Sequence, residues 1–144
     1  MFEENIAASQ RLFEEVWSQG NLDAIDEICA EGYVDHDPVL GDSDREGLKQ
    51  AIQGYRHSFP DLAFTIDEIF AAGDKVVMRW TGEGTFENEI MDQEPTGEKG
   101  DPVRGIAIDR FEDGRLVESW GFWDTLTFMR NIGALPSEAA ATTG

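Results

Sequence analysis

One acidic residue near the C-terminus, Asp124, follows an aromatic segment and has the chemistry of a general base. Counting by twos along the strand expected at residues 115–123 puts Trp120, Phe122 and Asp124 on one face. If that face lines a cavity, loss of water raises the pKa of Asp124 and suits it to remove a proton next to a carbonyl. The alternative is that Asp124 caps a helix starting at Thr125, in which case backbone donors lower its pKa.

His36 is the second candidate, because the pKa of histidine lies closest to neutrality. It stands between Asp35 and Asp37 in a segment, residues 33–38, that we expect to be a loop. It could polarise a substrate carbonyl or relay a proton, or it could be a structural loop residue. A metal site is a weaker alternative, because consecutive residues of an extended segment point to opposite sides and no second His is near in the sequence.

Aromatic residues supply the wall of a candidate binding pocket, with an arginine to orient a carboxylate or an enolate. For each aromatic residue, ordinary core packing is the alternative. No Gly-rich phosphate loop, Ser-His-Asp spacing or Cys-x-x-Cys pattern occurs, so a nucleotide site, a serine-hydrolase triad and a zinc finger have no support. The expected substrate-contacting residues are Tyr33, Arg79, Trp80, Phe86, Trp120 and Phe122.

Three helices are expected to precede the strands that carry these residues. Apolar residues recur at helical spacing, and glycines, capping residues and Pro60 mark the ends. The first helix ends at Gly20, the second runs from an Asn21 cap to Gly32, and the third runs from Ser43 or Asp44 to about Ser58.

The second half of the chain has the alternation of half-buried strands. Two hairpins are expected, with turns at residues 72–74 and 112–114, and a phase shift at Asp67 and Glu68 indicates a bulge. Residues 87–102 are expected to form a mobile loop or lid, and a short helix ends near Gly133. Helices followed by long antiparallel hairpins predict an α+β domain over residues 1–135, with a disordered tail at 136–144.

Composition restricts the partners of this domain. The chain has 144 residues, with 30 acidic against 11 basic side chains and a formal net charge of -19. Such a surface repels nucleic acid and anionic membranes, and the even spread of acids favours the hypothesis of a protein from a high-salt cytoplasm. The first residues lack a signal peptide and no apolar run reaches membrane-spanning length, so a cytoplasmic location is expected.

Several motifs, in this order and spacing, resemble the SnoaL-like polyketide cyclase family, within the nuclear-transport-factor-two-like superfamily. The resemblance covers about residues 2–135 and rests on Val34–Pro38, Phe59–Leu62, Ala72–Val77, Arg79–Trp80, Pro95–Gly97 and Arg110–Trp120, with Asp124.

The resemblance implies a cone-shaped barrel, in which a strongly curved, mostly antiparallel sheet wraps over three N-terminal helices and a short helix follows. It also implies a homodimer formed through the outer sheet face. Polyketide cyclases of this family close a ring by intramolecular aldol condensation without metal or cofactor, with an aspartate that matches Asp124 as acid and base. Phe86 stands where family members often carry a histidine.

Two functions of different classes follow from these observations. The first is a cofactor-independent cyclase or isomerase that acts on a small apolar or polyketide-like substrate, with Asp124 as the base and His36 as the donor. The second is a non-catalytic protein that binds a small hydrophobic ligand in the same cone. An accessory or dimerisation domain with a filled cone is a third interpretation.

Overall fold

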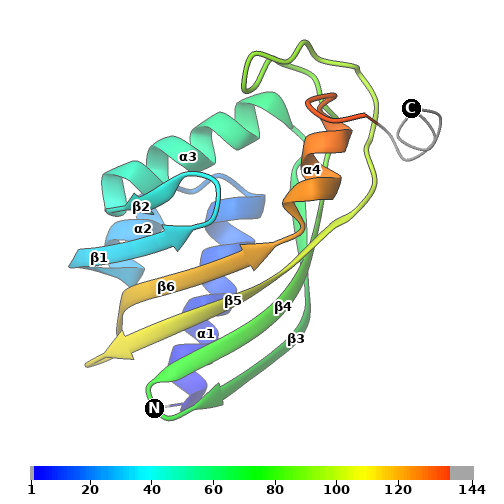
Figure 1. The fold of residues 1–144 in the computed structure, drawn as a ribbon. Helices are drawn as coiled ribbons and strands as arrows, with labels where there is room; N and C mark the ends of the chain where they lie inside the picture. Colours follow the sequence, from blue (N-terminus) through cyan, green and yellow to red (C-terminus); the bar gives the residue numbers. More distant parts are fainter. Residues whose placement is uncertain (1, 137–144) are drawn as a thin grey trace.

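The computed structural model describes residues 2–136, so the tail expected at 136–144 lies, from residue 137 on, outside the described residues. Helices and strands follow the expected order, with helices first and long strands after them (Figure 1). The elements are α1 (Phe2–Arg11), the π-helical η1 (Leu12–Ser18), α2 (Asp23–Ile28), β1 (Cys29–Asp37), β2 (Gly41–Ser43), α3 (Arg45–Ser58), β3 (Ala63–Ala72), β4 (Lys75–Glu83), β5 (Val103–Glu112), β6 (Arg115–Trp123) and α4 (Thr125–Asn131).

The strands form one six-stranded sheet in the order β2-β1-β6-β5-β4-β3. The neighbouring pairs are antiparallel except β1 and β6, which run parallel. The sheet curls without closing, since β2 and β3 remain at its two edges (Figure 1). The predicted α+β fold with a strongly curved, mostly antiparallel sheet is therefore confirmed.

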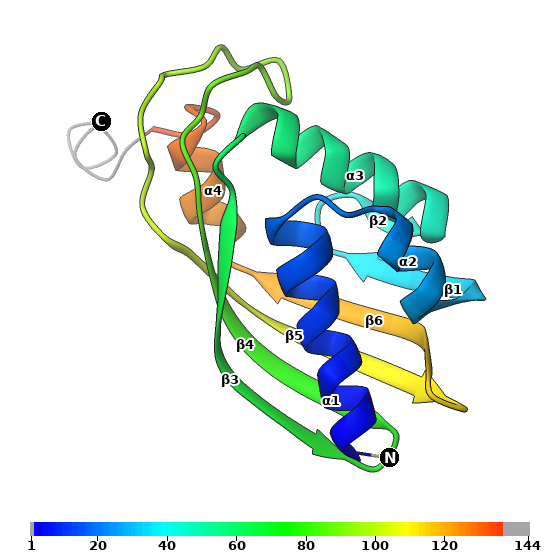
Figure 2. The ribbon, with the colours of Figure 1, turned by 180° about the vertical axis from the view of Figure 1, so that it is seen from behind.

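The helices lie on the inner, concave face of this sheet (Figure 2). α1 crosses β3 and β4, whereas α3 lies beside β1 and β2, and α4 stands at the end of the sheet reached by β6 (Figures 1 and 2). The core between the layers is fully buried at Val16, Ile25, Ile52, Val76 and Met78. The helices and the sheet together leave an enclosed space beside this core, described below.

Local signals placed the hairpins and the bulge correctly. The register of β3 against β4 shifts between Ile66 and Glu68, where the sequence predicts a bulge. The turn between β5 and β6 places Asp113 and Gly114 at positive φ, which an Asp-Gly pair tolerates better than most pairs. Asp44 caps α3 through a hydrogen bond from the Gly47 amide, one of the two expected caps.

Two predictions about the first half of the chain are wrong. The second helix ends at Ile28 rather than Gly32, and Leu22 rather than Asn21 is its N-cap, without a side-chain bond. Residues 33–37 belong to strand β1 instead of a loop, because they pair with β6, about 85 residues further along the chain. Such long-range pairing has no local signal, and it changes which side chains of β1 face inward.

The segment between β4 and β5 is anchored on the protein rather than carried as a free loop. The Ser58 carbonyl accepts a hydrogen bond from the Glu87 amide, and Asp61 accepts hydrogen bonds from the Thr85 amide and hydroxyl. Phe86 inserts between Phe59 and the last helix, in a second apolar cluster. The expectation of a mobile lid therefore has no support in these contacts.

Candidate functional site

A cavity of about 150 Å³ lies between the concave sheet face and the helices. This is the volume of an engineered protein cavity that accommodates benzene. Aromatic residues are the largest group in its wall, with indole, phenol and phenyl rings contributed by several elements. The rings come from Phe13, Trp17, Tyr33, Tyr55, Phe59, Phe64, Trp80, Trp123 and Phe128, and the acidic residues are Asp35, Asp37, Glu83, Asp101 and Asp109.

Three of these acids project from the sheet into the cavity. Asp35 of β1 is paired in register with Ser119 of β6, and Ser119 is in turn paired with Asp109 of β5. Neighbouring strands are about 4.8 Å apart, so the two carboxyl groups flank one serine. Asp37 follows Asp35 on the same face of β1, since side chains alternate along a strand.

Asp109 is the most deeply buried acid of the three. Its carboxylate accepts hydrogen bonds from the hydroxyls of Ser9 in α1, at 2.7 Å, and Ser119, at 2.8 Å. Burial raises the pKa of Asp109, although both hydrogen bonds oppose the shift. The residue connects the first helix to the sheet at the floor of the cavity, with both oxygens already engaged.

Asp35 has the environment of a general base. Removal from water raises the pKa of Asp35 to about 7, with further contributions from the negative charges of Asp37 and Asp109. His36 and the Tyr33 hydroxyl oppose this shift. A carboxyl group with such a pKa can both take and return a proton near neutral pH.

Asp37 is held rigidly by three N–H groups. Its Oδ1 accepts hydrogen bonds from the amides of Val39, at 2.7 Å, and Leu40, at 2.9 Å. Its Oδ2 accepts one from the Trp123 indole at 3.2 Å. The two aspartates of β1 thus have different surroundings: one is fixed by donors, and the other is desolvated.

Tyr55 of α3 contributes a further polar group to the wall. Its hydroxyl oxygen is buried and finds no hydrogen-bond partner among residues 2–136. Burial and the charge of Asp37 raise the pKa of this hydroxyl, so it stays protonated. A buried donor without a partner is costly, and a carbonyl oxygen of a ligand in the cavity would satisfy it.

Three of the residues predicted to contact substrate line the cavity, Tyr33, Trp80 and Trp120, although the ring of Trp120 points outward. Tyr33 is 2% exposed. Burial is the main cause of the raised pKa of its hydroxyl, and the negative charges of Asp35 and Asp109 raise this pKa further. The Trp80 ring lies over Gly105, where an added Cβ would be 2.4 Å from the indole and 2.7 Å from the Cβ of Trp123. Only glycine leaves room for the Trp80 ring here.

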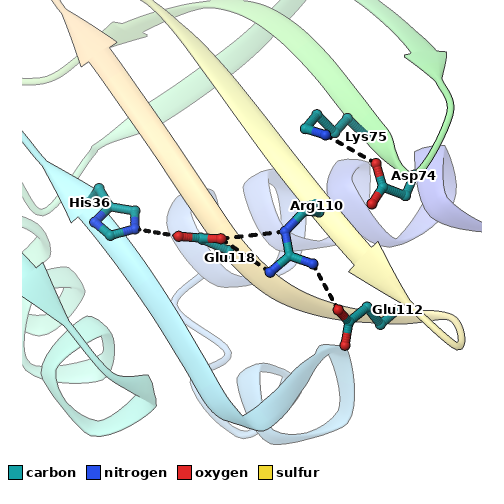
Figure 3. A network of polar contacts seen from close by, with 6 residues as sticks. All are labelled: His36, Asp74, Lys75, Arg110, Glu112 and Glu118. Atoms are coloured by element: carbon teal, nitrogen blue, oxygen red, sulfur yellow. Dashed lines mark hydrogen bonds and ion pairs between the residues drawn. The ribbon is translucent and has the colours of Figure 1, made fainter.

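His36 lies on the opposite, outer face of the sheet (Figure 3). Its Nδ1 and Nε2 contact Asp42 and Glu118, each at 2.7 Å, and its ring stacks on Trp120. These two carboxylates raise the pKa of His36. Glu118 also accepts hydrogen bonds from Arg110 (Figure 3). The prediction that His36 lies in the pocket is therefore wrong. Side chains alternate between the two faces of β1, so His36 points away from the face that carries Asp35 and Asp37.

At the end of β6, too, the sequence analysis assigned the outward-facing residues to the cavity. Trp120 contributes to the wall, but its ring lies outside against His36, and Phe122 is 68% exposed. Asp124 is exposed and caps α4, accepting hydrogen bonds from the Thr127 amide and hydroxyl, and these bonds lower its pKa. The predicted desolvation of Asp124 is wrong, and the capping alternative is confirmed.

Two further predicted contacts lie away from the cavity. Phe86 is 1% exposed and supports the wall from behind, stacked on Phe59. Arg79 lies on the outer face of β4, where it contacts Glu68 and Asp67. Its neighbours in the strand, Met78 and Trp80, are the inward residues. Neither side chain can therefore touch a ligand in the cavity.

Sequence reasoning missed Asp35, Asp37, Asp109 and Tyr55 as cavity residues. A signal for the first two was present: Tyr33, which was predicted to contact substrate, shares a strand face with both when residues are counted by twos. That count requires a strand, and the segment was assigned to a loop. Asp109 and Tyr55 come to the cavity only through tertiary packing.

Two negative findings concern the part of the chain that the structure describes. Residues 2–136 contain no cluster of three or more His, Cys, Asp or Glu side chains placed to hold a metal ion. None of the described helices combines the length and the apolar character needed to cross a membrane.

Comparisons with known proteins agree with this geometry. The sequence matches the SnoaL-like polyketide cyclase family over residues 7–132. A protein from Acidithiobacillus ferrooxidans assigned as a polyketide cyclase is 31% identical, with a TM-score of 0.79 over 90% of this chain and 94% of that one. IdmH from Streptomyces antibioticus, also assigned as a polyketide cyclase, is 29% identical, with a TM-score of 0.77 over 90% and 98%.

A SnoaL-like protein from Jannaschia superimposes with a TM-score of 0.84 over 94% of this chain and 95% of that one, and its 23% identity supports the fold alone. Among curated proteins no relative matches this sequence significantly. The family match covers nearly the whole domain, and its cone with a cavity is the fold described above. This chain belongs to the SnoaL-like polyketide cyclase family.

Proposed function

We propose that the protein is a cofactor-independent cyclase or isomerase that removes a proton next to a carbonyl of a small, largely apolar substrate, with Asp35 as the base. The observation that carries this proposal is the juxtaposition, in one aromatic cavity, of a desolvated carboxyl group and an unpartnered tyrosine hydroxyl. Asp35 takes the role that the sequence assigned to Asp124.

The chemistry needs no group beyond these residues. The Asp35 carboxylate takes the proton from the α-carbon, and the C–H electron pair forms the enolate. The Tyr55 hydroxyl donates to the enolate oxygen and stabilises the charge that develops there. In a cyclisation, the α-carbon then attacks a second carbonyl of the same molecule, forming a C–C bond, and the new alkoxide receives a proton from Asp35.

Several features of the cavity favour this reaction over simple storage. A protein that only binds an apolar molecule gains nothing from desolvating a carboxyl group, because that burial costs stability. The aromatic walls exclude water and hold a flat substrate. The alternative, a non-catalytic binding protein, predicts ligand binding without proton transfer.

The test measures exchange of α-protons, so it does not require the natural substrate. β-Tetralone is incubated with the protein in D₂O buffer, and loss of its α-proton signal is followed by NMR. We expect exchange faster than in buffer, and a decrease of about 10²-fold or more in Asp35→Asn. Tyr55→Phe removes only the donor, so we expect an intermediate loss of about tenfold or more.

Asp124→Asn is the matched control, because it is the same substitution at an exposed aspartate of the same domain. It should leave the exchange rate within about twofold, since asparagine also caps helices well. Binding of β-tetralone with exchange at the buffer rate would support the binding-protein alternative. Exchange that survives Asp35→Asn would assign the proton transfer to another residue.

We also propose that two copies associate through the outer sheet face. Phe70, Ile106 and Phe122 are each about half exposed or more on β3, β5 and β6, a concentration of apolar surface unusual for a free face. Ile106 and Phe122 are direct cross-strand neighbours. Sedimentation should give a dimer, and Phe122→Glu should shift it toward monomer; a monomer at all concentrations would contradict the proposal.

The acidic surface favours a high-salt environment. A net charge of -19 causes mutual repulsion that salt screens. We expect the melting temperature to rise as KCl is added up to about 2 M, well beyond the range in which ordinary screening saturates. A melting temperature that is independent of KCl would contradict this hypothesis.

A further inference from the structure

The charges around the cavity all have one sign. Among the described residues that line it, five are Asp or Glu and none is Lys, Arg or His. Two of these acids are at the rim, where Glu83 is paired with Lys99 and Asp101 lies next to Asn131. The interior acids have no cationic partner. A carboxylate or phosphate on a ligand would therefore meet like charges in a desolvated space.

The interior acids differ in what they can offer to a ligand. Both oxygens of Asp109 are occupied by Ser9 and Ser119, below the floor of the cavity. Asp35 is the desolvated base. Asp37 retains capacity, because its Oδ2 accepts a single bond, of 3.2 Å, from the Trp123 indole, and a carboxylate oxygen can accept more than one.

The negative charge of Asp37 acts on other groups that line the cavity. It is the largest charge contribution to the raised pKa of Asp35, and it also raises that of Tyr55. The Trp123 indole stands beside it and donates to it directly, and Trp80 lines the same cavity. A carboxylate next to an indole ring suits an ammonium group, which gains from the charge and from the ring face together.

We propose that the cavity selects substrates that carry a protonated amine near the reacting carbonyl, with the ammonium group bound by Asp37. This inference rests on the proposed function and names its substrate class, an amino ketone with an apolar ring. Asp35 and Asp37 are two residues apart on one strand face, so their side chains start about 7 Å apart. That separation matches an ammonium group at one carboxylate and an adjacent carbon acid at the other.

The arrangement also has a chemical consequence. An ammonium group next to the α-carbon withdraws electrons and stabilises the carbanion formed there. It also balances the charge of Asp37, which otherwise opposes an enolate in the cavity. The two carboxylates then have separate tasks: Asp37 orients the substrate, and Asp35 moves the proton.

The first experiment compares three ligands that share one benzyl group and differ in its polar substituent: benzylamine, benzyl alcohol and phenylacetate. Calorimetric titration at about 0.3 M NaCl limits nonspecific attraction of cations to the acidic surface. We expect benzylamine to bind at least about tenfold more tightly than benzyl alcohol, and phenylacetate to bind least. Equal or weaker binding of the amine to the wild-type protein would overturn the proposal, and this comparison needs no variant.

Variants then locate the amine. Asp37→Asn should reduce the preference for benzylamine over benzyl alcohol to about twofold or less, whereas Asp35→Asn should keep most of it. Asp42→Asn, on the outer face beside His36, is the control for the overall charge and should keep all of it. A preference that survives Asp37→Asn, in a variant whose melting curve remains cooperative, would overturn the assignment to Asp37.

Gly121→Val provides a second, independent variant. Gly121 lines the cavity, and nothing lies within 4 Å of the position of an added Cβ, so the new side chain fills open space without removing a polar group. Binding of both benzylamine and benzyl alcohol should weaken by about tenfold. Unchanged benzylamine binding in Gly121→Val would mean that the amine binds outside the cavity, which would overturn the proposal.

Exchange measurements separate this inference from the proposed function. Phenacylamine and phenacyl alcohol differ only in the amine, and their α-proton exchange is compared after subtraction of the buffer rate. We expect kcat/KM to favour phenacylamine by about tenfold or more, with the preference lost in Asp37→Asn. Exchange of both ketones without preference leaves the proposed function intact and overturns the amine proposal. Amine binding without any exchange supports the amine proposal for a binding protein and overturns the enzymatic one.

Discussion

The inner and outer faces of β1 and β6 carry the same kinds of residues in opposite electrostatic states. On the inner face, burial raises the pKa of Asp35 to about 7. On the outer face, the contacts with His36 and Arg110 lower the pKa of Glu118. One strand pair therefore presents, toward the cavity, an acid whose pKa lies near neutrality and, toward solvent, an acid whose pKa is lowered.

The two faces also differ in how completely their polar groups are partnered. Both ring nitrogens of His36 contact carboxylates, those of Asp42 and Glu118. Figure 3 shows that the Glu118 carboxylate is shared with Arg110. Inside, the Tyr55 hydroxyl finds no partner in the described part of the chain. Groups that are already satisfied stabilise a sheet, whereas groups that await a partner are available to a ligand. The face that carries the candidate site is thus the one with the unpartnered hydroxyl.

Among the variants that test this difference between the two faces, Asp35→Asn should have the largest effect, an increase in the free energy of unfolding. Because the folded-state pKa is raised to about 7 from an unfolded value near 4, the folded protein binds more protons than the unfolded chain between these values. The contribution of Asp35 to the free energy of unfolding therefore becomes less favourable as pH rises from about 4 to about 7, and constant above that. The asparagine variant avoids this cost.

We expect Asp35→Asn to be more stable than the wild type by an amount about 2–3 kcal/mol larger near pH 8 than near pH 5. Urea unfolding at several pH values measures this difference. Glu118→Gln is the outer-face counterpart: its lowered pKa gives the opposite sign, so no gain should develop as pH rises. A pH-independent gain in Asp35→Asn would mean that Asp35 is not desolvated in solution.

A smaller effect is expected where the inner wall is tightest. An alanine Cβ at position 105 would lie 2.4 Å from the Trp80 ring and 2.7 Å from Trp123 Cβ, so at least one indole must move. Gly105→Ala should cost about 1–3 kcal/mol of unfolding free energy, measured in urea, and weaken ligand binding.

Gly121→Ala is the matched substitution on the same inner face, at a position where nothing lies within 4 Å of the added methyl group. It should change stability by no more than about 0.5 kcal/mol in either direction. Equal costs for Gly105→Ala and Gly121→Ala would contradict the tight packing of the Trp80 indole over Gly105.

The sequence predicted which residues share a face of each strand. It did not predict which of the two faces lines the cavity. Counting by twos correctly grouped Trp120, Phe122 and Asp124, yet these two aromatic residues were taken as a sign of the cavity, and they cover the outside of β6, while Trp123 faces inward. Which face of a strand is concave depends on the bend of the whole sheet and on where the helices pack, neither of which is encoded locally.

The lack of a local signal also explains why the other residues of the site were missed. Hairpin turns, the β3 bulge and the α3 cap have local signals, and each was found. Asp109 meets Ser9 across 100 positions of the chain, and β1 became recognisable as a strand only through its pairing with β6. The cavity is built almost entirely from such distant contacts, so its acids could not be assigned from periodicity alone.

The smallest expected effect distinguishes a capping role of Asp124 from a catalytic one. Asp124 accepts hydrogen bonds from the Thr127 amide, at 3.0 Å, and hydroxyl, at 2.6 Å, at the start of α4. Asp124→Ala removes both and should lower the free energy of unfolding by about 1 kcal/mol, whereas Asp124→Asn, which keeps a capping oxygen, should cost less than half of that. Both variants should exchange β-tetralone protons at nearly the wild-type rate, because α4 packs on the cavity wall through Phe128, which a missing cap leaves in place. A large loss of exchange in Asp124→Asn, with stability unchanged, would return the proton transfer to the end of β6 and remove the distinction between the two faces.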